Sequence, residues 1–141
     1  MQPDVSEILK AGVAILDDLM RSYGFVYAST SAGVGSGGSF SGGELRRADR
    51  RLELHFRYSL GLVTYHLGPA ALSHEDYIWS VLGKRSASHY PGFSSNPMDG
   101  FRHLLLDLDQ CGSDFLGGAD SDFMRHVERA DLLKKSASCL P

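Results

Sequence analysis

The eight residues 51–58 alternate strictly between polar and apolar side chains. Because successive side chains of a β-strand point to opposite faces, this alternation predicts a strand with one buried face. The apolar side chains are those of Leu52, Leu54, Phe56 and Tyr58, and the polar ones are those of Glu53, His55 and Arg57. A strand of this kind favours an antiparallel sheet with one face on the core and the other towards water.

A second apolar run, residues 62–67, follows after Leu60 and Gly61. Glycine in the second position suits a tight two-residue hairpin turn, so we expect residues 60–61 to be the turn. This register pairs the apolar residues of the two strands: Tyr58 with Val63, Phe56 with Tyr65, and Leu54 with Leu67. On the polar face it places Arg57 opposite Thr64 and His55 opposite His66.

The remaining segments predict helices on both sides of a strand-rich region. Residues 5–23, 73–82, 97–116 and 120–135 have apolar residues at helical spacing, and Ser73 and Gly83 mark the two ends of the second helix. Strands are expected near residues 26–30 and 39–41, with the glycine-dense residues 33–38 as a mobile loop between them. We therefore expect an α+β fold: an N-terminal helix, an antiparallel sheet of about four strands, then two to three helices on one sheet face.

Length and composition favour one domain over residues 1–141, with residues 136–141 as a loose tail. The chain has 141 residues, of which 43% are hydrophobic, and a formal charge of −3, so strong nucleic-acid binding is not expected. Neither a signal peptide nor a membrane span is apparent. Because two cysteines do not make a disulfide framework, we expect a cytoplasmic protein. No cofactor motif is recognised, since the glycine-rich segment lacks the Gly-Lys-Ser/Thr ending of a phosphate loop.

The polar face of the predicted hairpin is the strongest candidate site. Its members are Glu53, His55, Arg57, Thr64 and His66. The histidines titrate near neutral pH and suit either acid–base chemistry or recognition, but the same face also fits a solvated sheet surface. Two histidines are too few for a metal site, so no metal is expected. Tyr90 and Phe93 lie in a Pro/Gly-rich loop that either folds back as a plug or projects as a recognition tip, and at such a tip they are candidate contacts.

Three other groupings have simpler structural explanations. The segment Ser73–Asp76 fits a helix cap with an acidic first turn. His103 and Asp107, four residues apart on one helix, fit an exposed surface pair. Cys111 lies on an apolar stripe and is expected to be a buried small hydrophobe.

The leading functional hypothesis is a non-catalytic protein-binding domain. In size, mild acidity and predicted layout the chain resembles bacterial immunity proteins, which neutralise a toxin by direct binding. That resemblance implies a toxin domain as partner. From charge and hydropathy, neither a nucleic-acid nor a membrane partner is expected. Two alternatives remain open: a small hydrolase or lyase that uses His55 and His66 as acid and base, and a structural subunit that self-associates.

Overall fold

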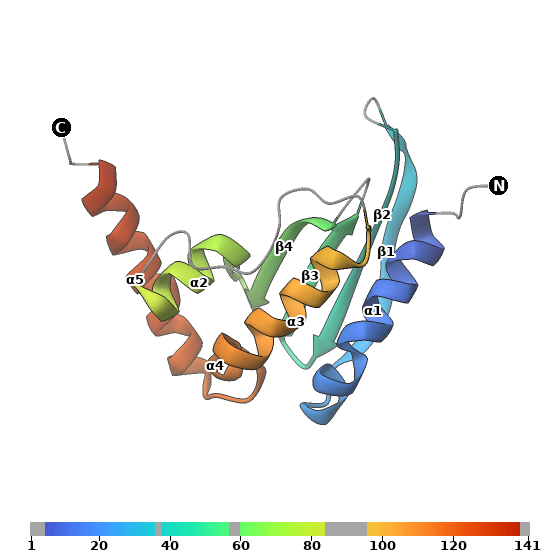
Figure 1. Cartoon of the computed structure of the whole chain (residues 1–141). Coiled ribbons are helices and arrows are strands. Elements are labelled where there is room, and N and C mark those ends of the chain that lie inside the picture. Colours follow the sequence, from blue (N-terminus) through green and yellow to red (C-terminus); the bar gives the residue numbers. More distant parts are fainter. Residues whose placement is uncertain (1–4, 36–37, 57–59, 84–95, 139–141) are drawn as a thin grey trace.

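The computed structural model describes residues 5–35, 38–56, 60–83 and 96–138. It is an α+β fold in which one helix precedes a five-stranded antiparallel sheet and further helices follow the sheet (Figure 1). The elements are α1 Val5–Ser22, β1 Val26–Gly35, β2 Gly38–Arg47, β3 Arg50–Phe56, β4 Leu60–Leu67, β5 Ala70–Ser73, α2 His74–Leu82, α3 Asp99–Cys111, α4 Ser113–Leu116 and α5 Asp120–Ser138.

The strands follow one another in the sheet in chain order, from β1 to β5. The predicted apolar face of the hairpin is confirmed: Leu52, Leu54 and Phe56 of β3 are buried, as are Val63 and Tyr65 of β4. They join apolar residues of the helices in one core. In Figure 1 helices α1 and α3 lie across this face of the sheet. The opposite face, which we call the open face, carries the alternate residues of each strand.

The predicted hairpin turn is wrong. Leu60 is a buried strand residue paired with Phe56, and Gly61 also lies in β4, so the connection falls on residues 57–59, which are not described. Leu54 pairs with Val63 rather than with Leu67, and the register shifts between His55 and Phe56. For residues 50–55 of β3 the change moves the partner by four residues, an even number, so their apolar side chains stay on one face.

Residues 46–51 show how the chain turns tightly and ties the sheet to the helices. Arg47 pairs with Arg50 across a two-residue turn in which Ala48 has a positive φ of 52°. Arg47 donates to the carbonyl oxygens of Tyr23 and Leu116, and Arg50 donates to that of Phe115. The bonds to Phe115 and Leu116 satisfy carbonyl groups at the C-terminal end of the short helix α4, where a cation is favoured.

The sheet and helix boundaries differ from expectation in several places. Most of the glycine-rich segment is paired strand, because β1 runs through Gly35 and β2 starts at Gly38. The structure adds a fifth strand, β5, directly before the N-cap Ser73. α3 ends at Cys111 and α4 is a separate helix, while α5 continues to Ser138, three residues into the expected tail.

Helix α2 has the predicted ends. The hydroxyl of Ser73 accepts a hydrogen bond from the backbone N–H of Asp76 at 3.2 Å, and Gly83 closes the helix with a φ of 73°. Both features follow from local chemistry, since serine is a favoured N-cap and glycine tolerates the left-handed conformation. The helix therefore starts immediately after the sheet ends, which fixes His74 in its first turn against β4.

Candidate functional site

The open face carries two rows of ionisable side chains that run across neighbouring strands. In the first row, Arg46 of β2 lies opposite Arg51 of β3, which lies opposite His66 of β4. We call these three residues the cation row. Val26 of β1 and Ala71 of β5 occupy the two ends of the same row. The three basic side chains are thus aligned on the central strands.

The adjacent row is acidic. Glu44 of β2 lies opposite Glu53 of β3, and Glu53 lies opposite Thr64 of β4. We call Glu44 and Glu53 the acid row. Ala28 and Ser73 continue this row on the two edge strands.

Ion pairs connect the two rows. Glu44 accepts a hydrogen bond from Arg51 at 2.9 Å and forms a second ion pair with Arg46. His66 Nε2 lies 2.9 Å from Glu53 Oε1. The Glu44 carboxylate is only 1% exposed, whereas the side chains of Arg46 and Arg51 are 58% and 39% exposed. The buried carboxylate therefore accepts a hydrogen bond from the guanidinium group of Arg51 and lies in ion-pair contact with that of Arg46, and both groups still reach solvent.

This arrangement is unusual for a sheet that only needs to be stable. Like charges directly opposite each other on neighbouring strands destabilise a sheet, and both Arg46–Arg51 and Glu44–Glu53 are such pairs. The ion pairs between the rows offset this repulsion. Placing opposite charges directly across the strands would avoid the repulsion altogether, so the two aligned rows favour a role in recognition.

The residues predicted to form the site are only partly together. Glu53, Thr64 and His66 are neighbours on the open face. His55 is on the same face but lies opposite Gly42 and Leu62, so the predicted His55–His66 pair is wrong. The two histidines are four strand positions apart, about 13 Å along the strand. Arg57, Tyr90 and Phe93 lie outside the described residues.

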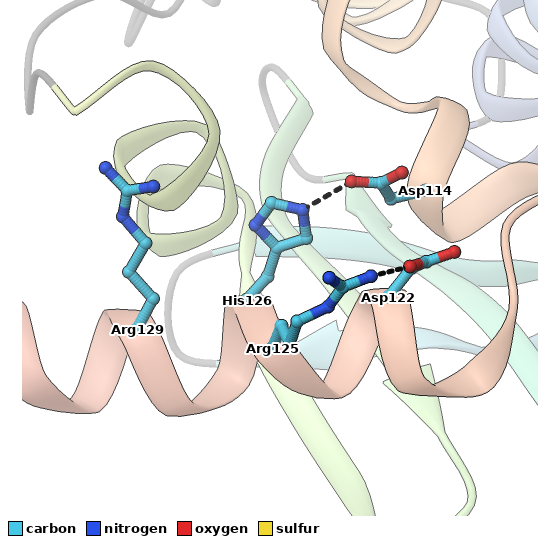
Figure 2. Close-up of a pocket in the computed structure, with 5 residues that line it drawn as sticks. All are labelled: Asp114, Asp122, Arg125, His126 and Arg129. Atoms are coloured by element: carbon cyan, nitrogen blue, oxygen red, sulfur yellow. Dashed lines mark hydrogen bonds and ion pairs between the residues drawn. The ribbon is translucent and has the colours of Figure 1, made fainter.

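A second candidate site is a pocket of about 350 Å³ at helices α4 and α5 (Figure 2). Its lining residues are Asp114, Asp122, Arg125, His126 and Arg129. Arg125 forms an ion pair with Asp122. His126 Nε2 lies 2.7 Å from Asp114 Oδ2, as Figure 2 shows, and its Nδ1 lies 2.7 Å from the hydroxyl of Ser80 on α2. Serine, histidine and aspartate are therefore connected in one chain of hydrogen bonds.

The Ser80–His126–Asp114 chain contains the three residue types of a catalytic triad, but its serine is not accessible to a substrate. The Ser80 side chain is fully buried within α2, so a substrate carbon has no route to its oxygen. A nucleophile must reach the reacting atom, and the buried Ser80 hydroxyl cannot. The chain of bonds therefore acts as a connection between α2, α4 and α5.

A third cluster is entirely internal. The hydroxyl of Tyr65 lies 2.8 Å from His74 Nδ1, and His74 Nε2 lies 2.7 Å from Asp107 Oδ2. Burial raises the pKa of Tyr65 well above its usual value, so the phenol stays protonated in this contact. This Tyr65–His74–Asp107 chain connects β4, α2 and α3 inside the core.

Sequence reasoning missed both histidine chains. His74 was assigned to a helix cap, and Asp107 was expected to be an exposed partner of His103, but Asp107 is buried and pairs with His74. The partners are 33 residues apart, so no helical or strand period connects them. A polar residue on the buried side of the α3 stripe is the one available signal, because a buried carboxylate needs a partner.

Cys111 is buried, as expected, and burial raises the pKa of its thiol. Over the described ranges, no cluster of three or more histidine, cysteine or acidic residues is placed to hold a metal ion. Nor does that part of the chain include a helix long and apolar enough to cross a membrane.

The chain matches no protein-family model, and no curated protein or solved structure shows significant similarity to it.

Proposed function

We propose that this chain is a protein-binding domain and that its binding surface is the open face. The observation that carries the proposal is the pair of arginines, Arg46 and Arg51, held side by side above the buried Glu44. Arginine is enriched at the centres of protein interfaces, where its planar group binds carboxylates through two parallel hydrogen bonds.

Fixing these side chains before binding reduces the entropy lost on association. A free arginine side chain loses about 0.5–1.5 kcal/mol of conformational freedom when a partner immobilises it. Here the carboxylate of Glu44 already restricts both guanidinium groups. The surface is therefore prepared for a partner without a change in the sheet.

The two rows also define the chemistry of the partner. Exposed guanidinium groups of the cation row fit carboxylates, and the half-exposed Glu53 beside them fits a basic group. A complementary surface has acidic and basic side chains in two adjacent rows, and this pattern sets both specificity and orientation. A more specific version of the proposal is an immunity-type protein that covers a toxin domain, which size, mild acidity and the helix-and-sheet layout support.

The acid–base alternative required His55 and His66 to act together. The register of β3 and β4 places these two histidines apart, which argues against that alternative. His66 instead contacts Glu53, which orients the imidazole without adding a nucleophile.

The test is affinity capture from a lysate of the source cells with the immobilised full-length chain. The variant is Arg46→Gln/Arg51→Gln, and the matched control is Arg21→Gln/Arg102→Gln. Both lose two positive charges, and the control arginines are exposed on α1 and α3, where they pair with Asp17 and Asp99.

We expect the wild type and the control to retain one protein in near-stoichiometric amount. The Arg46/Arg51 variant should retain at least about tenfold less, because two interface arginines contribute more than about 1 kcal/mol each. Equal recovery by both variants would exclude the open face, and recovery of no protein by the wild type would overturn the proposed function. Circular dichroism of each variant verifies that it is folded.

A further inference from the structure

The two edges of the sheet are protected very differently. β5 is four residues long, follows Pro69 directly, and packs against α5. Short strands, proline and a covering helix are ordinary means by which proteins prevent an edge from pairing with another chain. This edge is therefore closed to further strands.

β1, at the other edge, also contacts a helix, α1, but it has neither the short length nor the proline of β5. It is ten residues long, and its sequence contains neither a charged residue nor proline. Within the described chain no strand pairs with its outer side. Its one irregularity is a register shift between Ser29 and Ser31. An edge strand exposes a row of backbone N–H and C=O groups, which another extended strand can pair with.

We infer that β1 pairs antiparallel with β1 of a second copy of this chain, forming a continuous sheet across a two-fold axis. The lack of charged side chains on β1 favours a second copy of the same strand as its partner. A strand without charged residues meets its own copy without repulsion, whereas a strongly charged edge would repel it. The pairing is isologous, so it closes at two copies and does not continue into a fibre.

The exposed side chain of Val26 also favours pairing at the β1 edge. Its side chain is 69% exposed and lies at the β1 end of the cation row. Pairing of the β1 strands brings the Val26 end of each copy close to the second molecule and places the two open faces in one continuous surface. This interface uses the outer edge of β1 and not the side chains of Arg46 and Arg51, so it does not depend on the proposed function.

The register of the pairing predicts which residues meet. Full-length antiparallel pairing of Val26–Gly35 with its copy puts the two-fold axis between residues 30 and 31. Ser29 and Thr30 are exposed and lie next to this axis. The test variant is therefore Ser29→Lys/Thr30→Lys, which brings four positive charges together only in the dimer. The matched control, Gln110→Lys/Ser136→Lys, adds the same charge at exposed positions of α3 and α5.

The measurement is sedimentation equilibrium of the full-length chain from about 5 to about 500 µM, because an interface made by one strand pair is small and a micromolar dissociation constant is expected. Wild type and control should rise from 15.4 kDa towards twice that mass. Ser29→Lys/Thr30→Lys should remain at 15.4 kDa throughout.

The proposal is overturned if the wild type stays monomeric, if the lysine variant associates as the wild type does, or if the mass continues to grow beyond two copies. Thermal unfolding of the monomeric variant at low concentration verifies that β1 is still paired with β2, since loss of that pairing would lower the melting temperature.

Discussion

His74 Nε2 lies 2.7 Å from Asp107 Oδ2, and both side chains are buried. The contact joins the first turn of α2 to the middle of α3, and on its other side the imidazole is bonded to Tyr65 of β4. A polar chain of this kind inside a core stabilises the fold only while every member keeps its partner. Its removal has a specific and measurable cost.

Asp107→Ala should lower the free energy of unfolding by about 3–5 kcal/mol, because it leaves the buried His74 without its acceptor. Asp109→Ala is the matched control on the same helix, since Asp109 is exposed, and it should cost less than about 0.5 kcal/mol. Urea denaturation followed by circular dichroism measures both. Equal costs for the two variants would show that the His74–Asp107 contact contributes nothing to stability.

Stability should fall as pH rises above about 10. Burial raises the pKa of both Tyr65 and Tyr77, so each phenol stays protonated in the folded state at a pH where the unfolded chain ionises it. The folded state then binds more protons than the unfolded state, and each tyrosine reduces the free energy of unfolding by up to about 1.4 kcal/mol per pH unit. The contribution is complete below pH 10 and is lost above it.

Tyr77→Phe isolates one of these contributions. The buried Cys111 thiol, whose pKa is also raised, adds a slope from about pH 9, so the informative quantity is the difference between variant and wild type. Chemical denaturation between pH 8 and pH 11.5 should give a shallower decline for Tyr77→Phe. Parallel curves would mean that Tyr77 is accessible to hydroxide in the folded state.

Glu44 should contribute more to the free energy of unfolding than either one of its two ion pairs does. Glu44→Gln leaves Arg46 and Arg51 directly opposite each other without the carboxylate between them. We expect the free energy of unfolding to fall by about 1–2 kcal/mol. The value is this small because both guanidinium groups reach solvent, which screens their repulsion. In the Arg46→Gln/Arg51→Gln background the same substitution should cost less than half as much. A double-mutant cycle by urea denaturation measures this coupling. Additive losses would contradict the idea that Glu44 orients the two arginines.

Gly12→Ala should destabilise the chain even though alanine favours a helix by about 1 kcal/mol over glycine. A Cβ at this position of α1 would lie 2.3 Å from the buried Phe101 ring of α3, so the two helices would have to separate. We expect a net loss of about 1–3 kcal/mol. Ala14→Gly, at an exposed position of α1, is the control and should show only the ordinary helix preference. Stabilisation by Gly12→Ala would contradict the close α1–α3 contact.

Local patterns predicted the faces and several boundaries but not the register. The alternation around Leu54 identified the buried face of β3, and Ser73 and Gly83 identified the ends of α2. The turn at Leu60–Gly61 was wrong because an even shift of register leaves every apolar residue on the same face, so the hydrophobic pattern does not distinguish the two pairings.

The candidate site was predicted only in part, because local alternation gives the face of each residue but not its partner on the next strand. Glu53, Thr64 and His66 were placed on the correct face by alternation alone. The cation row also needs the alignment of β2 with β3, and the Arg46–Arg51 pair follows from a tight turn at residues 48–49 whose positive φ falls on alanine, a residue without a turn signal. The contacts of His74 and His126 depend on helix packing, which no local period encodes.

The most direct test of binding through the open face is the affinity of the purified captured protein for the full-length chain, measured by isothermal titration calorimetry. We expect Arg46→Gln/Arg51→Gln to weaken binding by about 30-fold or more, and Arg21→Gln/Arg102→Gln to change it by less than about twofold. Dissociation constants for Arg46→Gln/Arg51→Gln within twofold of wild type would contradict the assignment of the open face as the binding surface.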